Sequence, residues 1–140
     1  MNGKKGTTNI IFILPGSGYF QIARQILQFS MVAQDKMRDM ALSMAGTHEQ
    51  PHFENTSFRV GKKIFATLNP TANRACVKLN AVDQQVFSLY DKAAIYPVPN
   101  KWGNHGWTNI ELSLVKEEAL ADALACAYAE VKGAGSKKIT

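Results

Sequence analysis

The chain has 140 residues, of which 46% are hydrophobic and 19% charged. This is enough for one domain with a core, and it excludes a wholly disordered chain. The longest run of large aliphatic and aromatic residues covers residues 10–14, whereas a membrane-spanning helix needs about twenty residues and the apolar region of a signal peptide about seven or more. Cys76 and Cys126 are too few for a disulfide framework. We therefore expect a cytoplasmic protein without a membrane partner.

The positive charge is unevenly distributed along the chain. Sixteen basic and eleven acidic residues give a net charge of +5, but four of the lysines lie in the two tails. Between Asn55 and Val82 there is no acidic residue, while the same segment contains Arg59, Lys62, Lys63, Arg74 and Lys78. If these cations share a face, they form a patch for phosphate groups. The alternative is a solvated sheet face whose lysines discourage edge pairing.

Either one long helix or two helices that meet near Ser30 are predicted within residues 19–45, which contain neither Gly nor Pro. Apolar residues recur there at the spacings of three and four that are typical of one helical face: Ile22, Ile26, Phe29, Ala33, Met37, Met40 and Met44. Residues 1–18 are expected to form an arm with one short strand at 9–14. Such a helix would overhang the domain that follows it. The apolar stripe formed by these seven residues is therefore expected to pack on the protein's own core or against a second copy in a homodimer.

Residues 47–56 are polar and are expected to form a connector before the first two strands, at 57–60 and 63–68. Gly61-Lys62 between these strands is typical of a tight hairpin turn. The simplest register places Phe58 opposite Phe65, and it places Arg59, Ile64 and Ala66 on the other face. A one-residue bulge would change this register.

The next strand is predicted at 74–79, where Ala75, Val77 and Leu79 alternate with polar residues. Asn80 is a suitable cap for a short helix that ends near Tyr90. This helix is expected to bury three apolar residues: Val82, Val86 and Leu89.

Residues 94–99 contain two prolines, which indicate an edge or loop segment. A loop is expected at 100–106 and a strand at 107–112. The last helix is the clearest, because its apolar residues follow the helical repeat: Leu120, Ala123, Leu124, Ala127, Tyr128 and Val131. Together these elements predict a two-layer α+β fold in which an antiparallel sheet packs against helices.

The loop at 101–107 is unusually rich in residues that bind ligands. It contains Lys101, Trp102, His105 and Trp107, together with two glycines. Tryptophans can stack on bases, a lysine can meet a phosphate, and glycines allow close approach. The alternative is that both indoles cover the end of the core.

Metal and nucleotide motifs are weak or absent. His48 and His52 are four residues apart with Glu49 and Glu54 nearby, but Pro51 lies between the histidines and argues against a helical metal pair. The glycines match neither nucleotide-binding pattern, and there is no nucleophile elbow. We expect no metal, no cofactor and no catalytic residue, although these absences do not exclude every enzyme.

The order of motifs resembles the MmcQ/YjbR family over about residues 31–131. The matching segments are Pro51-His52-Phe53, residues 57–66, Val77-Lys78-Leu79, the Pro97/Pro99 segment and residues 103–107. The resemblance implies a secretion-chaperone-like fold with a "double-wing" motif that is described as DNA-binding. It also implies three parts: an extension at 1–30 that is partly disordered and then helical, a domain at 31–132, and a basic tail at 133–140. The extension and Lys116 depart from the family pattern.

We therefore expect a DNA-binding protein whose hairpin and adjacent strand contact the phosphate backbone. Six cations are the predicted phosphate contacts: Arg59, Lys62, Lys63, Arg74, Lys78 and Lys101. Four residues are candidates for a base or ligand contact: His52, Trp102, His105 and Trp107. The alternatives are a protein- or peptide-binding module, and a small-ligand or enzymatic site at the 101–107 loop.

Overall fold

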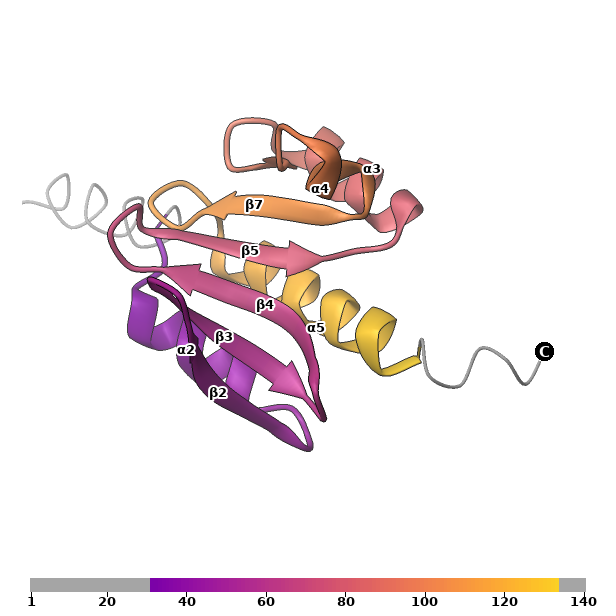
Figure 1. Cartoon of the computed structure of the whole chain (residues 1–140). Helices are drawn as coiled ribbons and strands as arrows, with labels where there is room; N and C mark the ends of the chain where they lie inside the picture. Colours follow the sequence, from indigo (N-terminus) through magenta and orange to yellow (C-terminus); the bar gives the residue numbers. More distant parts are fainter. Residues whose placement is uncertain (1–30, 134–140) are drawn as a thin grey trace, which may run out of the picture.

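The computed structural model describes residues 31–133, which form an antiparallel sheet of six strands and four helices (Figure 1). In chain order the elements are α2 (Gln34–Leu42), β2 (Thr47–His52), β3 (Asn55–Val60), β4 (Lys63–Asn69), β5 (Arg74–Lys78), α3 (Ala81–Tyr90), β6 (Ile95–Pro97), α4 (Lys101–Asn104), β7 (Trp107–Glu111) and α5 (Glu117–Gly133). The strand order is β2-β3-β4-β5-β7-β6. The expected α+β class is confirmed.

The core lies between one face of the sheet and the helices. In Figure 1, α5 passes behind β4 and β5, and α2 lies beside β2 and β3. The largest fully buried side chains come from strands, helices and the segments between them: Met37, Phe58, Phe65, Leu79, Ile95, Ile110, Leu112, Leu120 and Leu124. The stripe predicted for the last helix is confirmed, since Leu120, Ala123 and Ala127 are buried.

The expected connector at 47–56 is wrong, because most of this segment forms strand β2 at one edge of the sheet. An edge strand pairs on one side only and stays half exposed, so its residues need not be apolar. Pro51 is tolerated there because an edge strand leaves part of its backbone unpaired, and the other edge strand, β6, contains Pro97.

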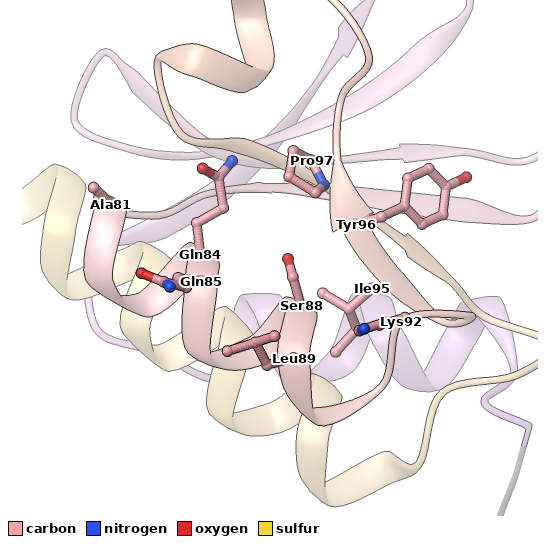
Figure 2. A pocket seen from close by; sticks show the side chains of 9 residues that line it. All are labelled: Ala81, Gln84, Gln85, Ser88, Leu89, Lys92, Ile95, Tyr96 and Pro97. Carbon is pink, nitrogen blue, oxygen red and sulfur yellow. The ribbon is translucent and has the colours of Figure 1, made fainter.

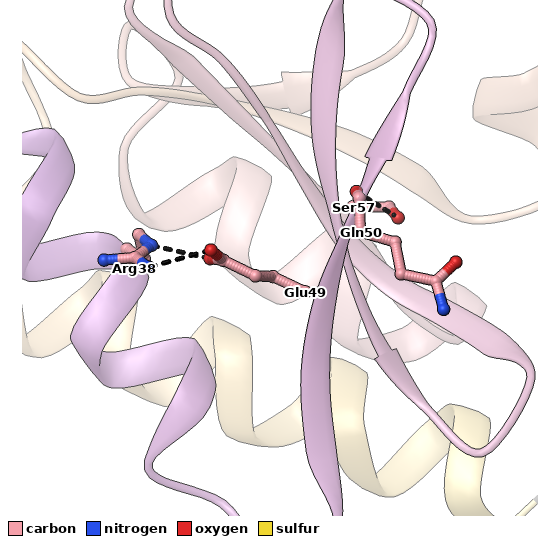
Figure 3. A network of polar contacts seen from close by, with 4 residues as sticks. All are labelled: Arg38, Glu49, Gln50 and Ser57. Carbon is pink, nitrogen blue, oxygen red and sulfur yellow. Dashed lines mark hydrogen bonds and ion pairs between the residues drawn. The ribbon is translucent and has the colours of Figure 1, made fainter.

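Strand β2 is held between α2 and β3 by polar contacts (Figure 3). The Arg38 guanidinium donates to both carboxylate oxygens of Glu49, at 2.6 and 2.8 Å. This hydrogen bond lowers the pKa of Glu49. On the β3 side, the Ser57 hydroxyl donates to the carbonyl oxygen of Gln50 at 3.0 Å. Side-chain bonds therefore fix an edge strand that contributes little to the core.

The hairpin between β3 and β4 turns at Gly61, whose φ of +62° explains why glycine stands there. Val60 pairs with Lys63 as expected. The register then shifts at a bulge, so that Phe58 pairs with Ala66 and not with Phe65. Both Phe65 and Ala66 are fully buried. The predicted Phe58–Phe65 pair, and the outward position of Ala66, are therefore wrong.

Helix α3 begins as predicted, because the Asn80 side chain accepts a hydrogen bond from the Asp83 backbone N–H at 2.8 Å. Its predicted buried face is wrong, since Val82, Val86 and Leu89 are 69%, 57% and 63% exposed. Helix α3 packs mainly beside the short edge strand β6, not across the sheet. It therefore covers less surface than a helix such as α5.

The helix predicted within 19–45 is shorter in the described residues, because residues 31–33 are not helical and α2 covers only Gln34–Leu42. The other elements follow the prediction closely. Segment 94–99 contributes the edge strand β6, and the loop expected at 100–106 includes the single-turn helix α4. The strand expected at 9–14, the first part of the stripe (Ile22 to Phe29) and the tail after residue 133 lie outside the described residues. Among the described helices, none combines the length and the apolar character needed to cross a membrane.

Candidate functional site

The face of the sheet opposite α5 carries a row of polar residues. In Figure 1, none of the described helices lies in front of β3, β4 and β5 on this face. The strand register aligns one residue from each strand across it: Gln50, Ser57, Thr67, Cys76, Asn109 and Tyr96. In the inner strands β4, β5 and β7, neighbouring residues are buried in the core instead: Ala66, Leu68, Ala75, Val77, Thr108 and Ile110. We call this surface the outer face.

A pocket of about 280 Å³ opens on the outer face. It is lined by residues from β2, β3, β4, β5, α4 and β7: His52, Asn55, Ile64, Thr67, Cys76, Trp102 and Trp107. Three of the four residues predicted to contact a base or ligand therefore meet around one pocket. The fourth, His105, is not part of the lining, although its ring centroid lies 6.2 Å from that of Trp102.

Two glycines let the loop that carries Trp102 fold tightly against the sheet. A side chain at Gly103 would overlap the backbone carbonyl of Val98. Gly106 has a φ of +101°, and a side chain there would overlap the carbonyl of Leu79. Only glycine combines this backbone angle with such a close approach. The Gly-x-x-Gly-Trp motif is therefore a packing requirement of the site.

Hydrogen bonds fix the same loop from several sides. The Asn100 side chain accepts from the Trp102 backbone N–H at 2.8 Å. From α3, the Gln84 amide donates to the Gly103 carbonyl at 2.9 Å and to the Thr108 hydroxyl at 3.1 Å. The half-exposed Trp102 is thus presented by a rigid support, which favours binding without rearrangement.

The turn between β2 and β3 adds an aromatic residue beside the pocket. Phe53 is 94% exposed and has a φ of +60°, an uncommon conformation for a bulky residue. Its ring centroid lies 4.8 Å from that of His52, which lines the pocket. The site prediction missed Phe53 because residues 47–56 were expected to form a connector and not two strands joined by a turn.

Four of the predicted phosphate-binding cations have specific partners. The Arg59 guanidinium donates to the Ser57 hydroxyl at 3.0 Å, and the Lys78 ammonium donates to the His105 carbonyl at 2.6 Å. Lys101 places its ammonium 5.7 Å from the centroid of the Trp102 ring. None of these three contacts is with a carboxylate.

Arg74 differs from the other predicted cations because it forms an ion pair. Its guanidinium donates to Glu111 on the neighbouring strand β7 at 2.8 Å, and the Tyr96 hydroxyl donates to the same carboxylate. The hydrogen bond to Glu111 raises the pKa of both Arg74 and Tyr96. Arg74 is therefore engaged within the sheet.

Lys62 and Lys63 occupy the tip of the β3–β4 hairpin, and both are exposed. Lys63 also lines a shallow cavity of about 190 Å³ with Lys78 and Glu130. The basic hairpin therefore stands at one end of the outer face, while Lys101 lies near the pocket.

The cysteine and histidine residues of the site provide neither a thiolate nor a cluster of metal ligands among the described residues. Burial raises the pKa of the Cys76 thiol to about 11, so the thiol is neutral at physiological pH. Within residues 31–133, no three His, Cys, Asp or Glu side chains lie close enough to hold a metal ion. The pairing of His48 and His52 with Glu49 and Glu54 therefore forms no metal site.

A second pocket, of about 520 Å³, lies between α3 and the edge strand β6 (Figure 2). Leu89 and Pro97 contribute apolar surface, and Figure 2 shows the Ser88 side chain pointing from α3 into this space. The Ser88 hydroxyl is buried and has no hydrogen-bond partner among the described residues. None of the predicted site residues lines this pocket. The outer face is therefore the candidate site.

Comparison with known proteins agrees with the motif order. A family model described as YjbR matches residues 42–130. The fold is similar to the crystal structure of Deinococcus radiodurans protein DR2400, with family-model domain DUF419, at 21% sequence identity and a TM-score of 0.65. The match covers 77% of this chain and 83% of that chain. No curated protein matches this sequence. Because the family model spans more than half of the sequence, the chain belongs to the YjbR family.

Proposed function

We propose that the protein binds DNA, with phosphate groups held by exposed cations on and beside the outer face. The observation that carries this proposal is the basic β3–β4 hairpin standing at one end of a sheet face that also holds an aromatic pocket. Cations fix the position of a nucleic-acid backbone, whereas aromatic and polar groups contact bases.

The pattern of ion pairs decides which cations are available. Within residues 31–133, the ion pairs use Lys36, Arg38 and Arg74. Of the six predicted phosphate contacts, Arg74 is thus neutralised by Glu111. Five cations are left for phosphates: Arg59, Lys62, Lys63, Lys78 and Lys101.

The test is fluorescence anisotropy of labelled DNA at several salt concentrations. If roughly five phosphates are neutralised, the logarithm of the binding constant falls against the logarithm of the salt concentration with a slope of about −4.5 for duplex DNA. Lys62→Glu/Lys63→Glu reverses two charges at the exposed hairpin tip. We expect this double variant to lose at least about tenfold in affinity and to give a shallower slope.

The control is Lys92→Glu/Lys116→Glu, which makes the same change in charge at two exposed lysines before β6 and before α5. It is expected to bind DNA nearly as well as the unchanged protein. An affinity that does not change with salt concentration would contradict phosphate binding by these cations. Equal losses of affinity in the two double variants would contradict a specific role for the hairpin.

A further inference from the structure

We infer that the pocket on the outer face receives one unpaired base, so that the protein prefers single-stranded DNA to an intact duplex. This inference rests on the proposed function and specifies its ligand. It begins from the division of charge on the surface, since the cations lie outside the pocket whereas the pocket lining contains neither lysine nor arginine.

The chemistry of the lining suits a neutral, flat, partly polar ring. Trp102 and Trp107 supply aromatic surface, and Ile64 supplies aliphatic surface. Asn55 and Thr67 provide donors and acceptors for the edge of a base. Because no lining residue carries a fixed charge that would hold a phosphate, the base is the part of a nucleotide that fits the pocket.

The placement of the aromatic rings excludes a base within a duplex. His52 is the last residue of the edge strand β2, with Phe53 beside it, while Trp102 comes from α4 and Trp107 from β7. The rings of the pocket thus come from distant strands of the sheet but lie on the same outer face. In a duplex, neighbouring base pairs cover the faces of every base, so these rings can stack only on a base that has left the helix.

The pocket and the cations are arranged for a single nucleotide strand. Lys101 is adjacent to Trp102 in sequence and holds its ammonium 5.7 Å from the indole centroid. A base on Trp102 would therefore bring its own phosphate within reach of this lysine. The hairpin lysines would contact phosphates further along the strand.

The experiment compares a single-stranded oligonucleotide, its duplex and an oligomer of the same length with every base removed. We expect the single strand to bind about tenfold or more tightly than the other two, since loss of stacking on one base corresponds to about five- to 150-fold in affinity. Trp102 and Trp107 are the two tryptophans of the chain. The single strand alone is therefore expected to quench tryptophan fluorescence strongly.

Two variants test the pocket without removing the basic hairpin. Trp102 is 53% exposed, so Trp102→Ala should fold, and we expect it to lose at least about fivefold in affinity for the single strand but not for the duplex. Phe53→Asn suits the left-handed backbone at this turn. It is expected to fold at least as well as the unchanged protein and to weaken single-strand binding alone.

The outcomes separate the two proposals. Equal affinity for the single strand and the duplex, with no effect of Trp102→Ala but a strong effect of Lys62→Glu/Lys63→Glu, would overturn the base pocket and leave DNA binding intact. Failure of all three oligomers to bind at low salt would overturn both proposals.

Discussion

Gly106 is the residue at which the site is most sensitive to a small change. Gly106→Ala adds a methyl group that meets the Leu79 carbonyl in a backbone conformation that favours glycine. We expect a loss of roughly 3 kcal/mol or more in the free energy of unfolding, because strain and steric overlap add. Urea denaturation followed by circular dichroism measures this change.

Gly61→Ala is the matched control for this substitution. Gly61 also has a positive φ, but a methyl group there meets nothing within 4 Å. Gly61→Ala is expected to lower the free energy of unfolding by only about 1–2 kcal/mol. Equal losses in the two variants would show that the loop moves away from Leu79 without resistance, which would contradict the rigid support described for Trp102.

Cys76 allows a second test at the same scale, based on its pKa. Burial raises the pKa of this thiol from 9.0 to about 11. The reactive thiolate is therefore about a hundredfold scarcer at pH 8 than in an ordinary cysteine. We expect Cys76 to be alkylated by iodoacetamide about a hundredfold more slowly in the folded protein than in urea, as measured by peptide mass spectrometry.

Because the pKa of Cys76 is raised by folding, the stability of the protein depends on pH in this range. The unfolded chain ionises its thiol near pH 9, whereas the folded protein keeps its proton until about pH 11. This residue therefore lowers stability as pH rises between these values. Labelling of Cys76 at the same rate in the folded and unfolded protein at pH 8 would show that the thiol is accessible and ionised.

Among the elements, α3 is the one whose exposed surface most needs a test. Val86 lies 57% exposed on α3, whereas Met37 on α2 is fully buried. We expect Val86→Gln to change the free energy of unfolding by no more than about 0.5 kcal/mol. Met37→Ala should cost about 2–5 kcal/mol. A loss at Val86 as large as that at Met37 would mean that another surface covers α3 in solution.

The errors at element scale have one physical source. The periodicity of Val82, Val86 and Leu89 predicts a helix correctly, but periodicity does not say where the partner of that helix lies. The polar segment that forms β2 gave no strand signal, because its stability comes from pairing with β3 and from the Arg38–Glu49 contact. Both errors depend on tertiary neighbours, which a local pattern does not contain.

At the scale of the whole molecule, the sequence predicted the layers of the fold but only part of the site. The glycines and tryptophans of the 101–107 loop indicated a binding loop. His52 joins that loop only because the end of β2 comes to the same pocket. Likewise, Arg74 is paired with Glu111 through the register of β5 and β7, which are separated in sequence by α3, β6 and α4.

The prolines of the two edge strands have a consequence for assembly. Pro51 and Pro97 lack the backbone N–H that an incoming strand would need, and they stand in β2 and β6, where such a strand would add. We therefore expect these two edges to disfavour edge-to-edge growth into amyloid-like aggregates and the addition of an extended peptide as a further strand. Within residues 31–133, the helices and the sheet faces are then the surfaces left for association between copies.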